Sequence, residues 1–204
     1  MVDLDRVGHI SRVVQDAHRA VRQMDAVDDR RESSTRVQAS LLLSVLPALD
    51  DLRRSLDPQM ARRIPPHVTA IYDDEAPDPD LMIRRLRAVC TKLPPIELHL
   101  DKIVGFEPSE QGLYVTTAAS TSFTNLRTQV LRPPFAPRSA SMWPHVTILH
   151  PRSAPACTVN WRSYIGSTIG RSMIVVRKVS VLEYVGETWR VRASILFDDV
   201  GRPE

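Results

Sequence analysis

Apolar residues recur along the chain with two different periods, and the change of period marks a change of structure. Through residues 3–31 they return every three or four positions with charged residues between them, which is typical of an amphipathic helix. From residue 36 onward, short apolar runs of strand length alternate with longer helical patterns. We therefore expect two parts, an N-terminal helical extension (residues 1–34) and a folded body (residues 35–200).

The body is predicted to begin as strand, helix, strand, helix and to continue mainly as strands. Helices are expected at 48–57, 78–93 and 121–131, the last two with polar or acidic starts that suit a helix N-terminus. Strands are expected at 36–47, 65–73, 96–107, 112–120, 143–151, 172–185 and 187–197, with a loop or short helix at 158–170. This order predicts an α+β fold with mainly antiparallel pairing.

One four-residue sequence, Pro-His-Val-Thr, occurs once in each half of the body, at 66–69 and at 144–147. Both copies begin an apolar stretch that is predicted to be a strand. The repetition favours a duplicated, bilobal fold, in which two mainly antiparallel sheets face a central cleft and the helices lie on the outside.

The two copies place chemically useful side chains on one face of each strand. Side chains alternate across a sheet with a period of two, so His67 shares a face with Thr69, and His145 with Thr147. If the strands are near one another, two imidazoles and two hydroxyls line one site. A neutral histidine can take a proton from an attacking water, while a protonated one donates a proton to the leaving oxygen. The hydroxyls can bind phosphate oxygens. The residues alone leave the acid and base roles exchangeable.

These paired motifs resemble the two H-x-T/S motifs of the two-histidine (2H) phosphoesterase superfamily, which includes RNA 2′,3′-cyclic phosphodiesterases, also called 2′-5′ RNA ligases. The resemblance covers about residues 36–197 and is strongest at the two motifs. It implies a bilobal fold with an open cleft and metal-independent opening of a 2′,3′-cyclic phosphate to a 2′-phosphate. It implies further that His67, His145, Thr69 and Thr147 are catalytic, with an RNA end or a cyclic nucleotide as substrate. The extension at 1–34 has no counterpart in the resemblance.

Residues that flank the motifs are candidates for substrate binding. Tyr72 ends the first strand and Trp143 precedes His145 by two positions, so either ring could stack on a base, although each could instead pack at the edge of the core. Arg138 and Arg152 flank the second motif and are expected to act as a pair on a phosphate or a nucleotide edge. His150, at an odd offset from His145, is expected to face away from the site.

The composition limits the other function classes. The formal net charge of +3 permits an anionic substrate without requiring one. Cys90 and Cys157 have no metal-ligand spacing and are expected to be reduced thiols in a cytoplasmic protein. No apolar run approaches the roughly 20 residues of a membrane span, so no membrane partner is expected.

Four alternatives are weighed beside the hydrolase. A metal site would need more ligands than two histidines, and no cofactor is expected. A non-catalytic RNA- or nucleotide-binding module of the same fold would fit the basic charge and Trp143, and 2′-5′ RNA ligation would be the reverse reaction. The N-terminal helix could also mediate self-association.

Overall fold

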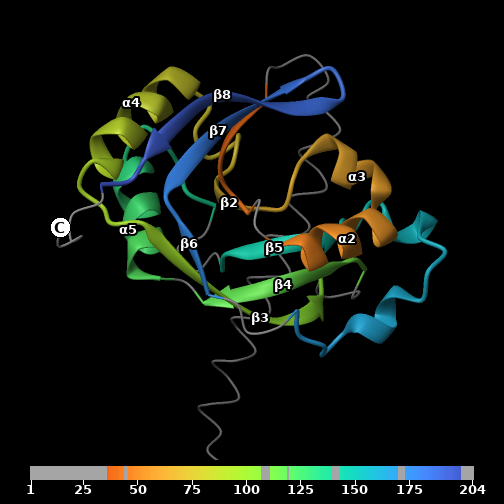
Figure 1. Cartoon of the computed structure of the whole chain (residues 1–204). Coiled ribbons are helices and arrows are strands. Elements are labelled where there is room, and N and C mark those ends of the chain that lie inside the picture. Colours follow the sequence, from red (N-terminus) through yellow and green to blue (C-terminus); the bar gives the residue numbers. More distant parts are fainter. Residues whose placement is uncertain are drawn as a thin grey trace, which may run out of the picture.

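The computed structural model describes residues 36–43, 46–106, 111–118, 120–138, 143–169 and 173–198. Figure 1 shows a curved sheet with helices packed beside it. The expected N-terminal helix and its self-association lie outside the described residues, and the boundary between residues 34 and 35 therefore stays a prediction.

Within the described residues, all eight strands belong to one sheet with the order β6-β3-β4-β5-β2-β1-β7-β8, and each neighbouring pair is antiparallel. The mainly antiparallel α+β prediction is thus confirmed. The strands are β1 (Val37–Leu42), β2 (His67–Ile71), β3 (Ile96–Gly105), β4 (Leu113–Ala118), β5 (His145–Leu149), β6 (Met173–Val176), β7 (Lys178–Val185) and β8 (Thr188–Leu196).

The helices begin where the sequence places proline or a capping side chain. They are α2 (Pro47–Leu56), α3 (Pro58–Arg63), α4 (Pro79–Cys90) and α5 (Thr121–Val130), followed by the 3₁₀ turns η1 (Ala154–Ala156) and η2 (Trp161–Tyr164). Asp57, Asp78 and Ser120 each accept a hydrogen bond from the backbone N–H three residues later, which satisfies a free donor at the start of α3, α4 and α5. None of the described helices is long and apolar enough to cross a membrane.

The prediction of two separate sheets was wrong, because the two motif strands β2 and β5 pair with each other and join both halves. The expected strand at 172–185 is also two strands, interrupted at Arg177. β6 pairs with β3 near one end of the sheet, whereas β7 pairs with β1 near the other. One connecting residue can join them only because the sheet curls and brings its distant strands together (Figure 1).

Each motif strand is packed by a helix from the other half of the chain. α2, which precedes β2 in the chain, packs against β5, whereas α5, which precedes β5, packs against β2. Val68 and Val146 are fully buried at the centre of the sheet and belong to one hydrophobic core with the buried residues of these helices. Because the core holds the valine face of β2 and β5 in place, it also fixes their other face, where the polar side chains lie.

Candidate active site

The sequence motifs meet at the centre of the sheet. Val68 of β2 pairs with Val146 of β5. One step to either side, the antiparallel register places His67 opposite Thr147, and Thr69 opposite His145. Residues opposite one another point to the same face, with Cβ atoms about 5 Å apart, so the four side chains form one compact block. Both strands show the same burial order, with half-buried His and Thr around a buried Val.

Both histidines are held in the same orientation by their own backbone. Nδ1 of His67 lies 2.9 Å from the carbonyl oxygen of Pro65, and Nδ1 of His145 lies 3.2 Å from that of Trp143. A carbonyl can only accept, so the proton of each neutral imidazole resides on Nδ1. Nε2 is then the free nitrogen of each ring, able to accept a proton when neutral and to donate one when charged.

The surroundings lower the pKa of both imidazoles. Burial is the main cause for each ring. The pKa of His67 falls to about 4, because burial is reinforced by the nearby positive charges of Arg53 and of protonated His145, while the carbonyl of Pro65 opposes the shift. His145 has no such cationic neighbour among the causes of its own shift. For both rings, burial therefore favours the neutral form over the charged one.

The neighbouring strands extend this face on both sides. Tyr114 and Thr116 of β4 lie beside Thr147 and His145, respectively. The ring of Tyr114 meets the His145 ring edge-on at a centroid distance of 5.1 Å, and Phe106 meets it at 5.8 Å. On the other side, Leu42 and Ser40 of β1 lie beside His67 and Thr69. Among the described residues, His145 thus has aromatic ring contacts and His67 has none.

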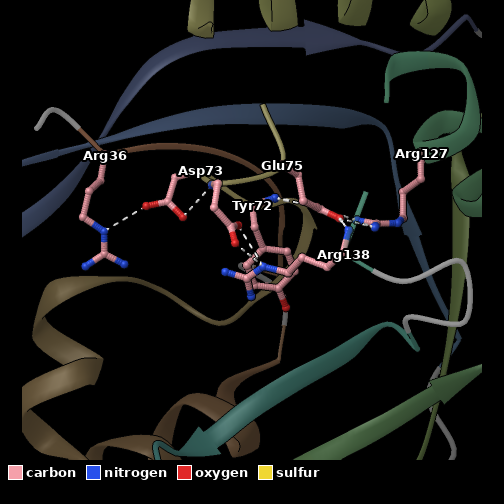
Figure 2. A network of polar contacts seen from close by, with 7 residues as sticks. Arg36, Tyr72, Asp73, Glu75, Arg127 and Arg138 are labelled. Atoms are coloured by element: carbon pink, nitrogen blue, oxygen red, sulfur yellow. Dashed lines mark hydrogen bonds and ion pairs between the residues drawn. The ribbon is translucent and has the colours of Figure 1, made fainter. Parts of the chain in front are cut away.

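Tyr72 and Arg138 come together at the end of β2 (Figure 2). The Arg138 guanidinium lies 4.3 Å from the centroid of the Tyr72 ring, and its Nε is 2.8 Å from both carboxylate oxygens of Asp74. The pKa of Tyr72 is raised, mainly by burial, against the opposing effects of Arg138 and of a side-chain hydrogen bond with Thr69. This arrangement links a candidate binding pair directly to the block of four side chains.

A buried carboxylate fixes that corner of the site. Glu75, which is fully buried, accepts hydrogen bonds from the backbone N–H groups of Tyr72 and Arg138 at 2.9 and 3.0 Å. It also forms an ion pair with Arg127 of α5, whose guanidinium donates to both of its oxygens (Figure 2). The same guanidinium donates to the carbonyl of Ala70 in β2. Tyr72 and Arg138 are therefore presented by a rigid, charge-paired support.

The remaining predicted binding residues have different outcomes. The Trp143 side chain is 67% exposed, which rules out the alternative that it packs in the core and leaves its ring free. Arg138 and Arg152 do not form the expected pair. Arg138 contacts residues at the end of β2, whereas Arg152 follows the end of β5 and donates its backbone N–H to His150. Because β2 and β5 are antiparallel, their ends lie at opposite sides of the site.

Two buried arginines near the motifs were missed from the sequence. Arg53 of α2 is 3% exposed and Arg127 of α5 is 8% exposed, and each donates to a carbonyl of the motif strand on which its helix packs. The signal was present in the pattern, because each arginine stands on the apolar stripe of its helix. The two stripes have the same spacing: Leu49, Leu52, Arg53 and Leu56 in α2, and Phe123, Leu126, Arg127 and Val130 in α5.

Other candidate features lie away from the histidines. A pocket of about 260 Å³ is lined by residues around Gln111, Cys157 and Trp161 and includes none of the four motif side chains. Among the described residues there is no group of three or more His, Cys, Asp or Glu that could hold a metal ion.

Comparisons with known proteins give this arrangement a context. The model of the 2′-5′ RNA ligase superfamily matches residues 43–158, more than half of the chain and including both motifs. A Bacillus cytotoxicus protein named "Putative phosphoesterase" is 30% identical over 100 residues, which are 48% of this chain and 58% of that protein. A Staphylococcus aureus protein with the same description is 33% identical over 81 residues, 39% of this chain and 47% of that protein. The chain spans about half the length of these curated relatives.

Solved structures share the fold. The protein TT0787 of Thermus thermophilus superimposes with a TM-score of 0.56 at 19% identity, covering 79% of this chain and 97% of that one. E. coli LigT in its apo form gives a TM-score of 0.50 at 14% identity, covering 81% and 99%. At these identities the likeness establishes the architecture.

Proposed function

The chain belongs to the 2′-5′ RNA ligase superfamily, and from that premise we propose that it is a phosphoesterase. Its proposed reaction opens a 2′,3′-cyclic phosphate, on an RNA end or a nucleotide, to a 2′-phosphate. The observation that carries the proposal is the pairing of β2 with β5, which gathers two imidazoles and two hydroxyls on one face. Diagonal side chains across a strand pair lie about 7–8 Å apart, a separation across which two imidazoles can contact one phosphate group placed between them.

The chemistry follows from the free Nε2 atoms. One neutral imidazole accepts a proton from water at Nε2 as the water oxygen bonds to phosphorus. The bond between phosphorus and O3′ breaks, and the other imidazole, protonated, gives its Nε2 proton to O3′. General acid–base catalysis of this kind contributes about 10²–10⁴-fold for each group. The hydroxyls of Thr69 and Thr147 donate to the non-bridging oxygens and hold the phosphorus in line.

The local charges support one assignment of roles. Arg53 and His145 both favour the neutral form of His67. The His145 ring, by contrast, contacts aromatic rings, and its pKa is lowered chiefly by burial. We therefore assign the base to His67, whose neutral form these two positive charges favour, and the acid to His145.

The nucleobase of the substrate is proposed to lie at the rim of the site, which Trp143, Tyr72 and Arg138 form. Arg138 already covers one face of the Tyr72 ring. A nucleobase would therefore stack on the exposed Trp143 ring or on the outer face of the Arg138 guanidinium, because planar guanidinium groups and aromatic rings both accept stacked bases. Arg152, exposed at the opposite side, is proposed to contact the continuing RNA backbone.

The product identifies the reaction. Purified protein is incubated with each nucleoside 2′,3′-cyclic monophosphate and followed by ³¹P NMR, with and without EDTA. The expected result is conversion to the 2′-monophosphate alone at the same rate in both conditions. A 3′-monophosphate product would contradict the proposed leaving group, and loss of activity in EDTA restored by zinc or manganese would contradict the metal-independent route. Recovery of bound but unchanged nucleotide would instead favour the non-catalytic binding module.

Ligation is the second candidate, favoured by the description of the family whose model the chain matches. In this reaction a 5′-hydroxyl RNA end attacks the cyclic phosphate in place of water, the bond between phosphorus and O3′ breaks, and a 2′-5′ phosphodiester forms. A mixture of RNA with a 2′,3′-cyclic end and RNA with a 5′-hydroxyl end tests it. Formation of a 2′-5′-linked product that depends on His67 and His145 would establish ligase activity.

A further inference from the structure

We propose that Arg53 is a positioning residue that holds the two motif strands at the separation a single phosphate requires. This role rests on the proposed function of His67 and His145. Two features of the structure support it: an unusual seam in the sheet, and the two backbone oxygens that the Arg53 guanidinium joins across that seam.

The seam lies between β2 and β5, the strands that carry the histidines. These strands share one paired position, Val68 with Val146, whereas every other neighbouring pair of described strands shares four or more. Backbone pairing alone therefore gives little resistance to a change in the angle between β2 and β5. Because each histidine belongs to a different strand, such a change would alter the distance between their Nε2 atoms.

Arg53 crosses this seam at the end where β2 begins. Its Nε donates to the carbonyl of Thr147 in β5 at 3.1 Å, and its Nη2 donates to the carbonyl of Ile64 at 3.0 Å. Thr147 is one of the four motif side chains, and Ile64 precedes His67 by three residues. The intervening Pro65 and Pro66 restrict the backbone between them. The guanidinium thus connects the second motif to the chain that enters the first.

Arg53 forms no ion pair with any described residue, although Asp50 and Asp57 are near enough to oppose the lowering of its pKa by burial. Its two hydrogen bonds both go to backbone carbonyls, and Nη1, although buried, has no hydrogen-bond partner in the described part of the chain. A planar guanidinium carries donors in a fixed fork that can span two oxygens, whereas the ammonium of lysine is a point charge on a flexible stem. Arg→Lys therefore removes the bridge while it keeps the positive charge.

Arg127 is the counterpart at the other end of the seam. It stands at the same place in the apolar stripe of α5 and donates to Ala70 in β2, but the Glu75 carboxylate also holds it. The buried ion pair makes Arg127 unsuitable for separating position from charge, because its removal strands a buried carboxylate. Arg53 is the cleaner residue to test.

The first test is Arg53→Lys, with Arg54→Lys as the matched control on the same helix. The Arg54 side chain is 58% exposed and pairs with Asp50 at the surface. With a nucleoside 2′,3′-cyclic monophosphate as substrate, Arg53→Lys is expected to lower kcat at least 10-fold with less than 3-fold change in KM, because a misplacement of about 1 Å can cost 10²-fold in rate. Arg54→Lys should change neither. If Arg53→Lys does not fold, Arg53→Met, which keeps the apolar stem, replaces it with the same expectation.

The second test does not depend on turnover. The pKa of His67 is measured by NMR of its ring in the intact chain, with and without His145→Gln. In the Arg54→Lys control, His145→Gln should raise the pKa of His67, because it removes a nearby positive charge. In Arg53→Lys this rise should be smaller, because the rings lie farther apart.

The outcomes separate the two proposals. An unchanged kcat, or a lower kcat with the full rise in the pKa of His67, would overturn the positioning role of Arg53. A reduced rise in a protein that turns over no cyclic phosphate would support the positioning role and contradict the proposed function.

Discussion

The strand with His67 and the strand with His145 are built alike and differ in what surrounds them. Each presents His-Val-Thr with the same burial order, and each imidazole directs Nδ1 to the carbonyl two residues earlier. His67, however, has the cationic Arg53 nearby, whereas His145 contacts the aromatic rings of Tyr114 and Phe106. A repeated sequence thus provides the same geometry twice, and the elements beside it make the two copies chemically different.

The supporting arginines differ in the same way. Arg127 is held by the buried carboxylate of Glu75, whereas the hydrogen bonds of Arg53 within the described residues go to backbone carbonyls. We expect the Glu75 side to depend on charge pairing and the Arg53 side to depend on shape. Substitutions on each side, taken from the largest expected effect to the smallest, can show whether the two halves are as unlike as their surroundings indicate.

The two histidines should be equally necessary but unequal in role. His67→Ala and His145→Ala are each expected to lower kcat/KM for a nucleoside 2′,3′-cyclic phosphate by about 10²–10⁴-fold, because each removes a proton-transfer group. A substrate with sulfur at the bridging 3′ position then distinguishes them, since a thiolate leaves without protonation. The His145→Ala enzyme should regain most of its rate on this substrate, and the His67→Ala enzyme should not.

The reverse pattern on the sulfur substrate would exchange the acid and base roles. Near-wild-type rates in both folded single variants, measured by initial velocities beside circular dichroism spectra, would remove the two-histidine mechanism altogether.

Glu75→Gln should weaken the half that relies on charge. The substitution leaves the buried Arg127 guanidinium without its carboxylate, and breaking a buried pair costs about 3–5 kcal/mol of unfolding free energy. Urea unfolding of the intact chain measures this loss of unfolding free energy. Asp51→Asn, which removes an exposed partner of Arg54, is the control and should cost less than about 1 kcal/mol. Equal, small losses for both variants would mean that Arg127 does not depend on the pair.

The threonines should behave alike despite their different neighbours. Thr69→Val and Thr147→Val each remove one hydrogen bond to a charged phosphate, worth about 1.5–3 kcal/mol, or roughly 10–100-fold in kcat/KM. Thr188→Val at the exposed start of β8 is the control. A loss confined to one threonine would show that the phosphate lies on one strand and not between the two.

The smallest effect concerns pH and stability. The pKa of His67 is about 4 in the folded protein and about 6.5 in the unfolded chain, so the unfolded state binds more protons between these values. Its contribution to stability is full above about pH 6.5 and is lost as the pH falls toward 4. We expect a loss of about 1–2 kcal/mol, allowing for water access to the half-buried ring. Urea unfolding from pH 7 to 4.5 should show this slope, and His67→Gln should flatten it; a slope unaffected by His67→Gln would contradict the assignment.

The sequence predicted most of the strands, and that His and Thr of each motif share one face, because alternation with a period of two is a local signal. It could not show that β2 and β5 are neighbours, because strand partners depend on contacts between distant segments. The break at Arg177 was hidden for a similar reason: apolar alternation continues on both sides, and only the curl of the sheet separates β6 from β7. Arg53 and Arg127 look like surface residues by type, and their burial follows from the carbonyls that the other half presents.

The claim that both motifs bind one phosphate can be tested most directly by a crystal structure of the chain with a nucleoside 2′-monophosphate, the proposed product. We predict one phosphate that contacts Nε2 of His67 and of His145 and accepts hydrogen bonds from Thr69 and Thr147. A phosphate bound by the residues of one strand alone, or bound away from the β2–β5 seam, would contradict it.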